Sequence, residues 1–283
     1  SGNHGVEVHG IITTTGELGI KSKGNINIVG DKHRIYGENY TSEYVEPSAI
    51  RAGSGFLVGD NINIVGSVLE IKDHLKMVSQ NGIKVIPIEI MYHYWQESKK
   101  TRVDITCIKN VVSSINAGHI NIDAGRAVEF MGALISTEEL DIHAGSLNIH
   151  SARDIFESQV DFRGKKKHIS GKRNTSSTHD VYETVVPTMI YAGNQRILVD
   201  GDASMEAAQL FAREDILLKV GGSLSIKDGY NFHLHDYHQK SYKTFSSKGG
   251  GMTFNKSRTV HESYTEHESV PTIICAGGTF YGI

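Results

Sequence analysis

Short runs of alternating apolar and polar residues recur along the chain, separated by glycines. Residues 119–122 (HINI), 140–143 (LDIH) and 147–150 (LNIH) are the clearest, and comparable runs return at steps of about 20 to 25 residues. Alternation with a period of two is typical of β-strands that bury only one face. The pattern therefore predicts an internally repeated, all-β chain.

Within these runs the isoleucines and asparagines are expected to face opposite ways, because successive side chains of a strand point to opposite sides. The inward set is Ile26, Ile28, Ile62, Ile64, Ile120 and Ile122, and the outward set is Asn25, Asn27, Asn63 and Asn121. Successive turns stacked at about 4.8 Å would bury the isoleucines, which no single strand can do. We expect Asn25/Asn27 and Asn61/Asn63 to form hydrogen-bonded ladders outside the stack.

Four Ala-Gly steps mark the register of the repeat, at Ala52-Gly53, Ala117-Gly118, Ala192-Gly193 and Ala276-Gly277. In three copies a proline (Pro47, Pro187 or Pro271) precedes the alanine by five residues, and Ser113 lies near that place in the fourth. Proline suits the start of a strand. The blocks lie near residues 8–36, 52–91, 117–156, 192–232 and 276–283, each with about three strand-bearing turns. Glycines are expected at corners that need a positive φ, namely Gly24, Gly30, Gly59, Gly66, Gly125, Gly145, Gly221 and Gly222.

Polar inserts separate the blocks, near residues 37–45, 92–109, 157–185 and 233–270. They alternate and are rich in Tyr, His, Lys, Ser and Thr, which favours strands over loose linkers. We expect antiparallel hairpin arms that leave the stack, return to it and pair with one another beside it. The tip of the third insert, KKKHISGKRNTSS, is the best candidate for disorder.

Composition supports an aliphatic repeat chain. Hydrophobic residues make up 39%, aromatic residues only 8%, and there are 30 glycines. A net charge of −3 gives no overall attraction to nucleic acid or membrane, and two cysteines indicate no disulfide framework. The sequence shows no signal peptide and no apolar run long enough for a membrane-spanning helix. It starts and stops within the pattern, so we interpret residues 1–283 as a single segment of a longer protein.

The repeats resemble a known family. The steps AG-x-INI, GALIS-x-EELDI-x-AG-x-LNI and A-x-DI resemble the haemagglutinin repeats of filamentous-haemagglutinin-like exoproteins. Interruption of about every third turn by a Ser/Thr/Lys-rich arm (KSYKTFSSKGGGMTF, residues 240–254) resembles the second, C-terminal repeat region of those proteins. Contact-dependent growth-inhibition exoproteins are the nearest relatives that the motifs suggest. The chain departs from the common pattern in having few AG-x-D-I steps.

The resemblance implies a right-handed parallel β-helix, with lateral β-hairpin arms inserted about every three turns. It implies secretion by the two-partner (type Vb) route through an outer-membrane transporter, and a location outside the cell or on the bacterial surface. In the growth-inhibition branch, the second repeat region is associated with the outer membrane of the target cell and with delivery of a C-terminal toxin. The chain contains neither the secretion domain nor a toxin domain of that family.

Histidines in the fourth arm form a candidate metal site. His233, His235 and His238 lie near Asp236, with His261 and His267 on the returning strand. On an extended strand His233 and His235 share a face, which suits zinc or copper. The alternative, which we favour, is that an exposed arm uses His and Tyr as cross-strand pairs.

Polysaccharide cleavage would need carboxylates gathered on one face across adjacent turns. The candidates are Asp60, Asp123, Glu138, Glu139, Asp141, Asp200, Asp202, Glu214 and Asp215, but they occupy differing places in the blocks. Turn carboxylates are ordinarily solvated, and no GxSxG, HExxH, P-loop or calcium nonapeptide is present. We therefore predict no catalytic, cofactor-binding or metal-binding residues.

Two surface clusters are candidate contacts with an envelope. The basic insert carries Arg163, Lys165, Lys166, Lys167, Lys172 and Arg173, which suit an anionic surface such as lipopolysaccharide, although a hairpin tip is more often simply solvated. Trp95 with Tyr92 and Tyr94 suits an interfacial anchor, but packing on the flank of the stack is the favoured alternative.

These observations favour a non-catalytic repeat shaft of a large two-partner-secreted exoprotein, of the growth-inhibition type. Its partners would be the outer-membrane transporter and the target-cell outer membrane or lipopolysaccharide, and not nucleic acid. One alternative is an adhesin shaft that binds host glycan or protein through its arms. Another is a β-helical carbohydrate-active enzyme.

Overall fold

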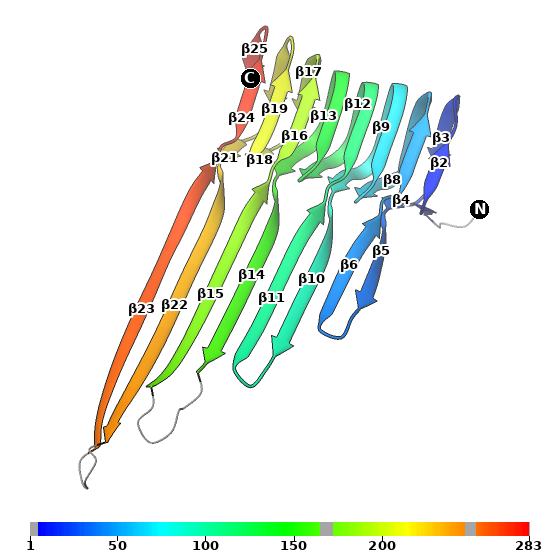
Figure 1. The fold of residues 1–283 in the computed structure, drawn as a ribbon. Coiled ribbons are helices and arrows are strands. Elements are labelled where there is room, and N and C mark those ends of the chain that lie inside the picture. Colours follow the sequence, from blue (N-terminus) through cyan, green and yellow to red (C-terminus); the bar gives the residue numbers. More distant parts are fainter. Residues whose placement is uncertain (1–4, 165–171, 247–252, 283) are drawn as a thin grey trace.

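The computed structural model describes residues 5–164, 172–246 and 253–282. Its elements are β-strands in two sheets (Figure 1). The first sheet contains only parallel pairs, and we call it the parallel stack. Its strands are β1 (Val6–Val8), β2 (Ile11–Thr13), β3 (Glu17–Lys21), β4 (Ile26–Val29), β7 (Ala49–Ala52), β8 (Ser54–Val65), β9 (Val68–Ile86), β12 (Ser114–Met131), β13 (Leu134–His150), β16 (Thr188–Ala192), β17 (Asn194–Val199), β18 (Ala203–Glu206), β19 (Ala208–Ala212), β20 (Ile216–Val220), β21 (Leu224–Lys227), β24 (Ile273–Ala276) and β25 (Phe280–Gly282).

The second sheet has eight strands, is antiparallel throughout and projects from one side of the parallel stack (Figure 1). We call it the arm sheet. Its strands are β5 (Asp31–Tyr36), β6 (Tyr40–Glu46), β10 (Ile88–Glu97), β11 (Thr101–Val111), β14 (Ala152–Arg163), β15 (Lys172–Val186), β22 (Gly229–Ser246) and β23 (Thr253–Val270). In the part of the chain covered by the structure, no helix is long and apolar enough to cross a membrane.

Repetition of a unit of about twenty residues builds the parallel stack. Between β12 and β13, Ile115 lies opposite Ile135, Ile120 opposite Leu140 and Phe130 opposite Ile149. Each repeat of the pairing pattern therefore contains three strand segments, and we call such a set of three a layer. This long all-parallel sheet is consistent with the predicted β-helix.

Apolar side chains, all aliphatic except Phe130, form three buried columns along the stack, one for each segment of a layer. The columns are Ile50, Leu69, Ile115, Ile135, Ile190 and Leu210; Leu57, Met77, Ile122, Ile142, Ile197 and Leu218; and Ile28, Ile64, Val85, Phe130, Ile149 and Met205. All of these residues are buried. Because each layer covers the apolar side of its neighbour, stacking supplies the core that no single layer has.

The predicted directions of the isoleucines and asparagines are confirmed. All six inward isoleucines are buried. Outside the stack, Asn61 Nδ2 donates to Asn25 Oδ1 and Asn63 Nδ2 to Asn27 Oδ1, both over 2.8 Å. The asparagine ladder therefore joins adjacent layers as expected.

The Ala-Gly steps come into line at one corner of the stack. Ala52 and Ala117 both lie opposite Ile71, and Ala192 and Ala276 both lie opposite Ala212. The following glycines face the backbone of the preceding layer, where a Cβ on Gly53 would lie 2.6 Å from the Thr15 carbonyl oxygen. The register predicted from these steps is confirmed.

The prediction that the glycines between the runs lie at corners that need a positive φ was mostly wrong. Of the eight predicted corner glycines, only Gly66 is among the described residues with a positive φ. At Gly145 the constraint is space, because a Cβ would lie 2.6 Å from the Arg126 carbonyl oxygen of the preceding layer. Close approach of layers, and not the backbone dihedral angle, excludes a side chain there.

The predicted hairpin arms are present, but the spacing of about three turns between them is wrong. Between the second and third arms the chain makes two layers, β12 and β13, which pair along their lengths. Each glycine-separated run is one side of a layer and not a whole turn, so counting runs overestimated the turns. The hairpin strands also begin earlier than the predicted inserts, at Asp31, Ile88, Ala152 and Gly229.

Candidate functional site

All four arms leave the parallel stack at the same corner of a layer, in alternate layers. In the layers without an arm, the residue at this corner has a positive φ, at Gly10, Gly66, Gly132 and Ala207. That conformation turns the chain directly into the next segment. In the other layers the arm replaces the turn, so arms can be added without interrupting the buried columns.

A hydroxyl group closes the base of every arm. It belongs to the second residue after the returning arm strand, and it donates to the carbonyl group of the residue two positions before the outgoing strand. The pairs are Ser48 with Val29 (2.7 Å), Ser113 with Ile86 (2.6 Å), Thr188 with His150 (2.7 Å) and Thr272 with Lys227 (2.6 Å). Because Ser48, Ser113 and Thr188 are fully buried, these bonds give their hydroxyl groups the acceptor that water cannot supply.

The arms lengthen along the chain and pair side by side. Hairpins β5–β6, β10–β11, β14–β15 and β22–β23 grow from 6 and 7 residues to 18 and 18 residues per strand. Adjacent hairpins pair through β6–β10, β11–β14 and β15–β22. The predicted pairing of arms beside the stack is thus confirmed, and it produces one broad sheet with the order β5-β6-β10-β11-β14-β15-β22-β23.

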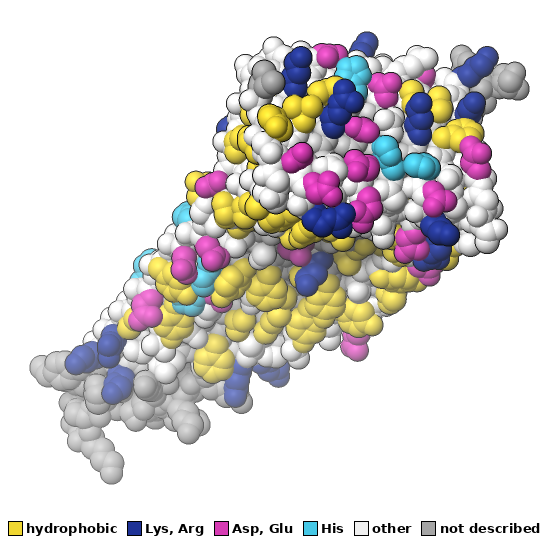
Figure 2. Space-filling view, turned by 90° about the horizontal axis from the view of Figure 1, so that it is seen from above, with side chains coloured by type: hydrophobic (Ala, Val, Ile, Leu, Met, Phe, Trp, Pro, Cys, Tyr) yellow, Lys and Arg dark blue, Asp and Glu magenta, His cyan; other side chains and the backbone are white. Residues whose placement is uncertain are grey.

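One side of the arm sheet carries most of its aromatic residues, and we call it the aromatic face. Strand alternation and the pairing register place on it Tyr40, Tyr44, Tyr92, Tyr94, Val103, Ile105, Cys107, Phe156, Val160, Phe162, Tyr182, His233, His235 and Tyr264. Neighbouring rings contact one another, as in Phe156 with Tyr182 (6.0 Å between centroids) and Tyr182 with His233 (3.9 Å). Figure 2 shows hydrophobic side chains gathered over the arm sheet.

The opposite side, which we call the ion-pair face, carries paired charges. These pairs are Lys32 and Arg34 with Glu43, His93 with Asp104, Arg153 with Glu183, His179 with Glu157 and His261 with Asp236. On the aromatic face the described pairs are His33 with Glu46 and His235 with Asp180. The two faces therefore differ in chemistry, one suited to water and the other not.

Glu43 is the most strongly perturbed acid of the arm sheet. Burial alone would raise the pKa of its carboxyl group, because the charged form loses hydration. Hydrogen bonds from Lys32 and Arg34 and from the Met91 N–H outweigh burial and lower this pKa to about 2. The cluster joins the first two arms, since Lys32 and Arg34 lie in β5, Glu43 in β6 and Met91 in β10.

Lysine and arginine residues gather where the arms end, far from the stack (Figure 2). Residues 162–179 and 237–261 contain eleven Lys and Arg and no Asp or Glu. Arg163 ends β14 and Arg173 lies in β15, beside β22 with Lys240 and Lys243. We call this region the basic distal end. Lys165, Lys166 and Lys167 and most of the predicted disordered tip lie outside the described residues.

The candidate metal ligands do not converge. His233 and His235 share the aromatic face as predicted, but His238, Asp236, His261 and His267 lie on the ion-pair face. His235 Nδ1 contacts Asp180 Oδ1 at 2.5 Å, and the His233 ring stacks on Tyr182. Within residues 5–164, 172–246 and 253–282, no group of three His, Cys, Asp or Glu is placed to hold a metal ion. Cross-strand pairing accounts for these histidines.

The candidate carboxylates of the stack make contacts between layers. Asp141 contacts His119, Asp123 and Asp200 contact His143, and Glu138 contacts Arg213. Glu139 and Glu214 both accept hydrogen bonds from Asn194 Nδ2. Solvated side chains that pair from one layer to the next make contacts of this kind. The contacts assign no catalytic role to these carboxylates.

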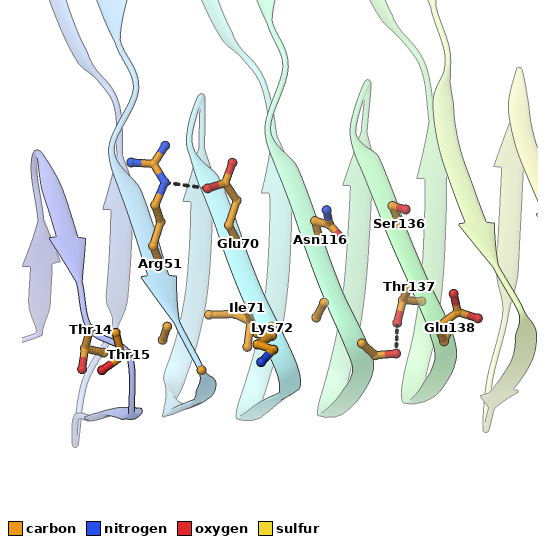
Figure 3. A pocket seen from close by; sticks show the side chains of 14 residues that line it. Thr14, Thr15, Arg51, Glu70, Ile71, Lys72, Asn116, Ser136, Thr137 and Glu138 are labelled. Atoms are coloured by element: carbon orange, nitrogen blue, oxygen red, sulfur yellow. Dashed lines mark hydrogen bonds and ion pairs between the residues drawn. The ribbon is translucent and has the colours of Figure 1, made fainter.

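An open groove of about 760 Å³ follows the Ala-Gly corner across successive layers (Figure 3). Its polar side chains contact other groups of the stack. Arg51 Nε donates to Glu70 Oε2 at 2.5 Å, and Thr137 Oγ1 lies 3.1 Å from the Gly118 carbonyl oxygen. The groove contains no aromatic side chain, and its small residues follow from the close packing of layers at this corner.

The aromatic cluster around Trp95 does not cover the flank of the stack, so that interpretation was wrong. Tyr92, Tyr94 and Trp95 all lie in β10 of the arm sheet. Tyr92 and Tyr94 point to the aromatic face, and Trp95 lies beside His93 on the ion-pair face. Alternation within residues 88–97 already separates Tyr92 and Tyr94 from Trp95. Which side chains lie beside each of them could be known only from the pairing of the arms.

Residues 96–168 match the family model described as Hemagglutinin repeat. The matched segment includes β11, β12, β13 and β14, that is, parts of two arms and the two layers between them. For these residues, the match confirms the haemagglutinin repeat that the sequence predicted. Neither the search of curated proteins nor that of solved structures found a match.

Proposed function

We propose that this haemagglutinin-repeat region of a filamentous-haemagglutinin-like exoprotein is a non-catalytic shaft of the growth-inhibition type, which engages the envelope of a target cell. Its stack extends the molecule, and its arm sheet presents a surface to one side. Export through an outer-membrane two-partner transporter belongs to the same proposal. Proteins of the filamentous haemagglutinin family are secreted or surface-exposed, which agrees with a role outside the cell.

For the stack, we propose a right-handed β-helix. The all-parallel pairing and the three buried columns support a chain that coils through one layer after another. Connections between parallel strands of one sheet are almost always right-handed, because strand twist favours that crossover. Such a shaft lengthens by repetition and needs no further core, which suits a very long exoprotein.

The proposal that the chain contacts an envelope rests on the basic distal end. Its described cations, such as Arg163, Arg173 and Lys243, lie toward the ends of the longest arms, and residues 162–179 and 237–261 contain no carboxylate that could neutralise them. Phosphate and carboxylate groups make an outer-membrane surface anionic, and clustered Lys and Arg bind such surfaces at about 1 kcal/mol per cation. We therefore propose the phosphates of lipopolysaccharide as the partner of this end.

Binding to vesicles that contain lipopolysaccharide tests this proposal. The chain should bind them, and binding should weaken as salt rises from about 50 to 300 mM, because screening shortens the reach of each charge. Replacing Arg163, Arg173, Lys240 and Lys256 by Gln should reduce affinity at least tenfold. A matched variant with Arg51, Arg126, Arg196 and Lys219 of the stack replaced by Gln should bind like the parent.

Equal loss in both variants would refute a specific role of the distal end. A second assay tests delivery, with the same substitutions made in the whole exoprotein and growth inhibition of target cells measured in co-culture. Inhibition should fall with the distal variant and persist with the stack variant. Strong binding to host glycans without binding to lipopolysaccharide would instead favour the adhesin function.

A further inference from the structure

The aromatic face is rich in apolar side chains, and no described part of the chain covers it. Each strand between β6 and β22 is paired on both sides, yet Tyr92, Phe156 and Tyr182 remain 41%, 39% and 41% exposed. Together with Tyr40 and the ring of His233 they form a row that crosses the sheet. A contiguous apolar area of this size on a soluble surface marks an interaction site.

Comparison of the two faces shows that only one of them is adapted to water. The ion-pair face carries charged pairs from β5 to β23, whereas the described ion pairs of the aromatic face lie outside β10, β11 and β14. An antiparallel sheet ordinarily buries one face and solvates the other. The arm sheet has the amphipathic pattern of one half of a β-sandwich, without the second half.

We propose that a second copy of this chain covers the aromatic face, so that two arm sheets pack face to face around a two-fold axis. An isologous interface needs a surface that complements itself, and Tyr, Phe, Ile and Val provide most of that fit by packing and not by charge. Packed sheets lie about 10 Å apart, a gap that interleaved aromatic side chains fill. The arm sheet projects beyond the stack, so the stacks do not shield this face (Figure 1).

The area agrees with a stable dimer. The six strands from β6 to β22 span about 25 Å at about 4.8 Å between strands, and seven residues of each span about 24 Å. Pairing two faces of about 600 Å² would bury about 1,200 Å² in total, at the lower end of the range of about 1,200–2,000 Å² for specific interfaces. A core rich in Tyr and Phe has the composition of such interfaces.

A lipid surface fits this face less well. Apolar surfaces that lie on anionic membranes are bordered by Lys and Arg. Here the polar groups beside the aromatic residues include Asp154, Asp180 and Glu266, with Lys109 at the base, and the other cations lie further out at the distal end. The charges therefore favour a protein partner over a membrane.

Sedimentation equilibrium of the chain, without lipid, measures the dimer directly. We expect a dimer, and replacement of Tyr92 and Phe156 by Ser should raise its dissociation constant at least tenfold. The matched control replaces Trp95 and Leu234, which lie on the ion-pair face of the same sheet, by Ser and should change it less than twofold. Circular dichroism shows whether each variant keeps the parent's fold.

A second measurement, of cysteine reactivity, uses the unaltered chain and therefore does not depend on the folding of the variants. Cys107 is a free cysteine of the aromatic face, opposite Tyr92 and Phe156, and Cys275 is a free, exposed cysteine of β24. Reaction of Cys107 with a maleimide should slow at least fivefold as dimer forms, while the rate at Cys275 stays constant. The difference between the two rates locates the interface.

Three results would overturn the proposal. They are a monomer at all concentrations, a dimer in which Cys107 reacts as fast as in the monomer, and a monomer whose Cys107 is protected only by lipid vesicles, which would assign the face to lipid. The test is independent of envelope binding, because the variant of the basic distal end should still dimerise. A dimer without lipopolysaccharide binding would refute only the proposed function.

Discussion

Replacing Ile122 by Asp tests the stacked core. Ile122 lies in the middle of a buried column, between Met77 of the preceding layer and Ile142 of the next, and is 1% exposed. Its neighbour Asn121 points outward, between Lys76 and Asp141. Asn121→Asp therefore adds a similar charge one residue away, on the solvated side, and serves as the matched control.

The expected cost has two parts. Loss of the buried isoleucine removes about 2–3 kcal/mol of hydrophobic stabilisation. An unpaired carboxylate within the column adds several kcal/mol, since no cation or hydrogen-bond donor in the column faces it. The sum exceeds about 5 kcal/mol, whereas the control should stay within about 0.5 kcal/mol because it remains hydrated. Ile122→Ala should lie between them, at about 2–5 kcal/mol.

Hydrogen exchange locates the damage, because layers contact only their neighbours. Amides of β9, β12 and β13 should lose protection in Ile122→Asp, while those of β19 and β20 keep most of theirs. Ile149→Asp, in another column, should act similarly on β13, β12 and β18. Urea unfolding followed by circular dichroism gives the loss of stability. If Ile122→Asp unfolds at the same urea concentration as Asn121→Asp, the buried column does not hold the layers together.

Three further substitutions, and one control for the second of them, test single contacts. Glu43→Gln should lower the free energy of unfolding by about 1–3 kcal/mol above pH 5. Because the pKa of Glu43 is lowered to about 2, the stability that its carboxylate contributes is lost as pH falls from 4.5 towards 2. The acid unfolding curves of parent and variant should therefore converge. Gly145→Ala should cost about 1–3 kcal/mol by thermal melting, since its Cβ would meet the Arg126 carbonyl group. Gly16→Ala, whose Cβ would be in ordinary contact with Thr14 Oγ1 at 4.0 Å, should cost less than about 1 kcal/mol. Ser113→Ala should cost about 1–3 kcal/mol in urea unfolding and speed amide exchange at the base of β10, because the Ile86 carbonyl group loses one of its two donors and keeps only the Gly66 N–H.

Several sequence predictions succeeded because they depended on local periodicity. A period of two places Ile120 and Ile122 on one face of any strand, whatever that strand packs against. Repetition of Ala-Gly then gives the register, since only small residues fit where layers approach closely. The arms were also recognisable, because polar segments rich in Tyr and Thr that alternate favour hairpins.

Other features depended on contacts between distant residues. The hydroxyl closures were visible as recurring Ser or Thr before each Ala-Gly step, yet their acceptors lie 19 to 45 residues earlier in the chain. The number of layers between arms required the pairing of β12 with β13. For the same reason, the sequence did not show that His233 and His235 have different cross-strand neighbours from His238.

By itself, the sequence determined that this protein is an all-β repeat whose layers share one aliphatic core. Alternation and glycine spacing are local properties, and stacking follows from them because it is the way to bury one-sided strands. Only the tertiary structure decided that the arms form a single sheet with an aromatic and an ion-pair face. Residues as distant as Tyr40 and His233 share that face because each arm pairs with the next, a relation that no local pattern encodes.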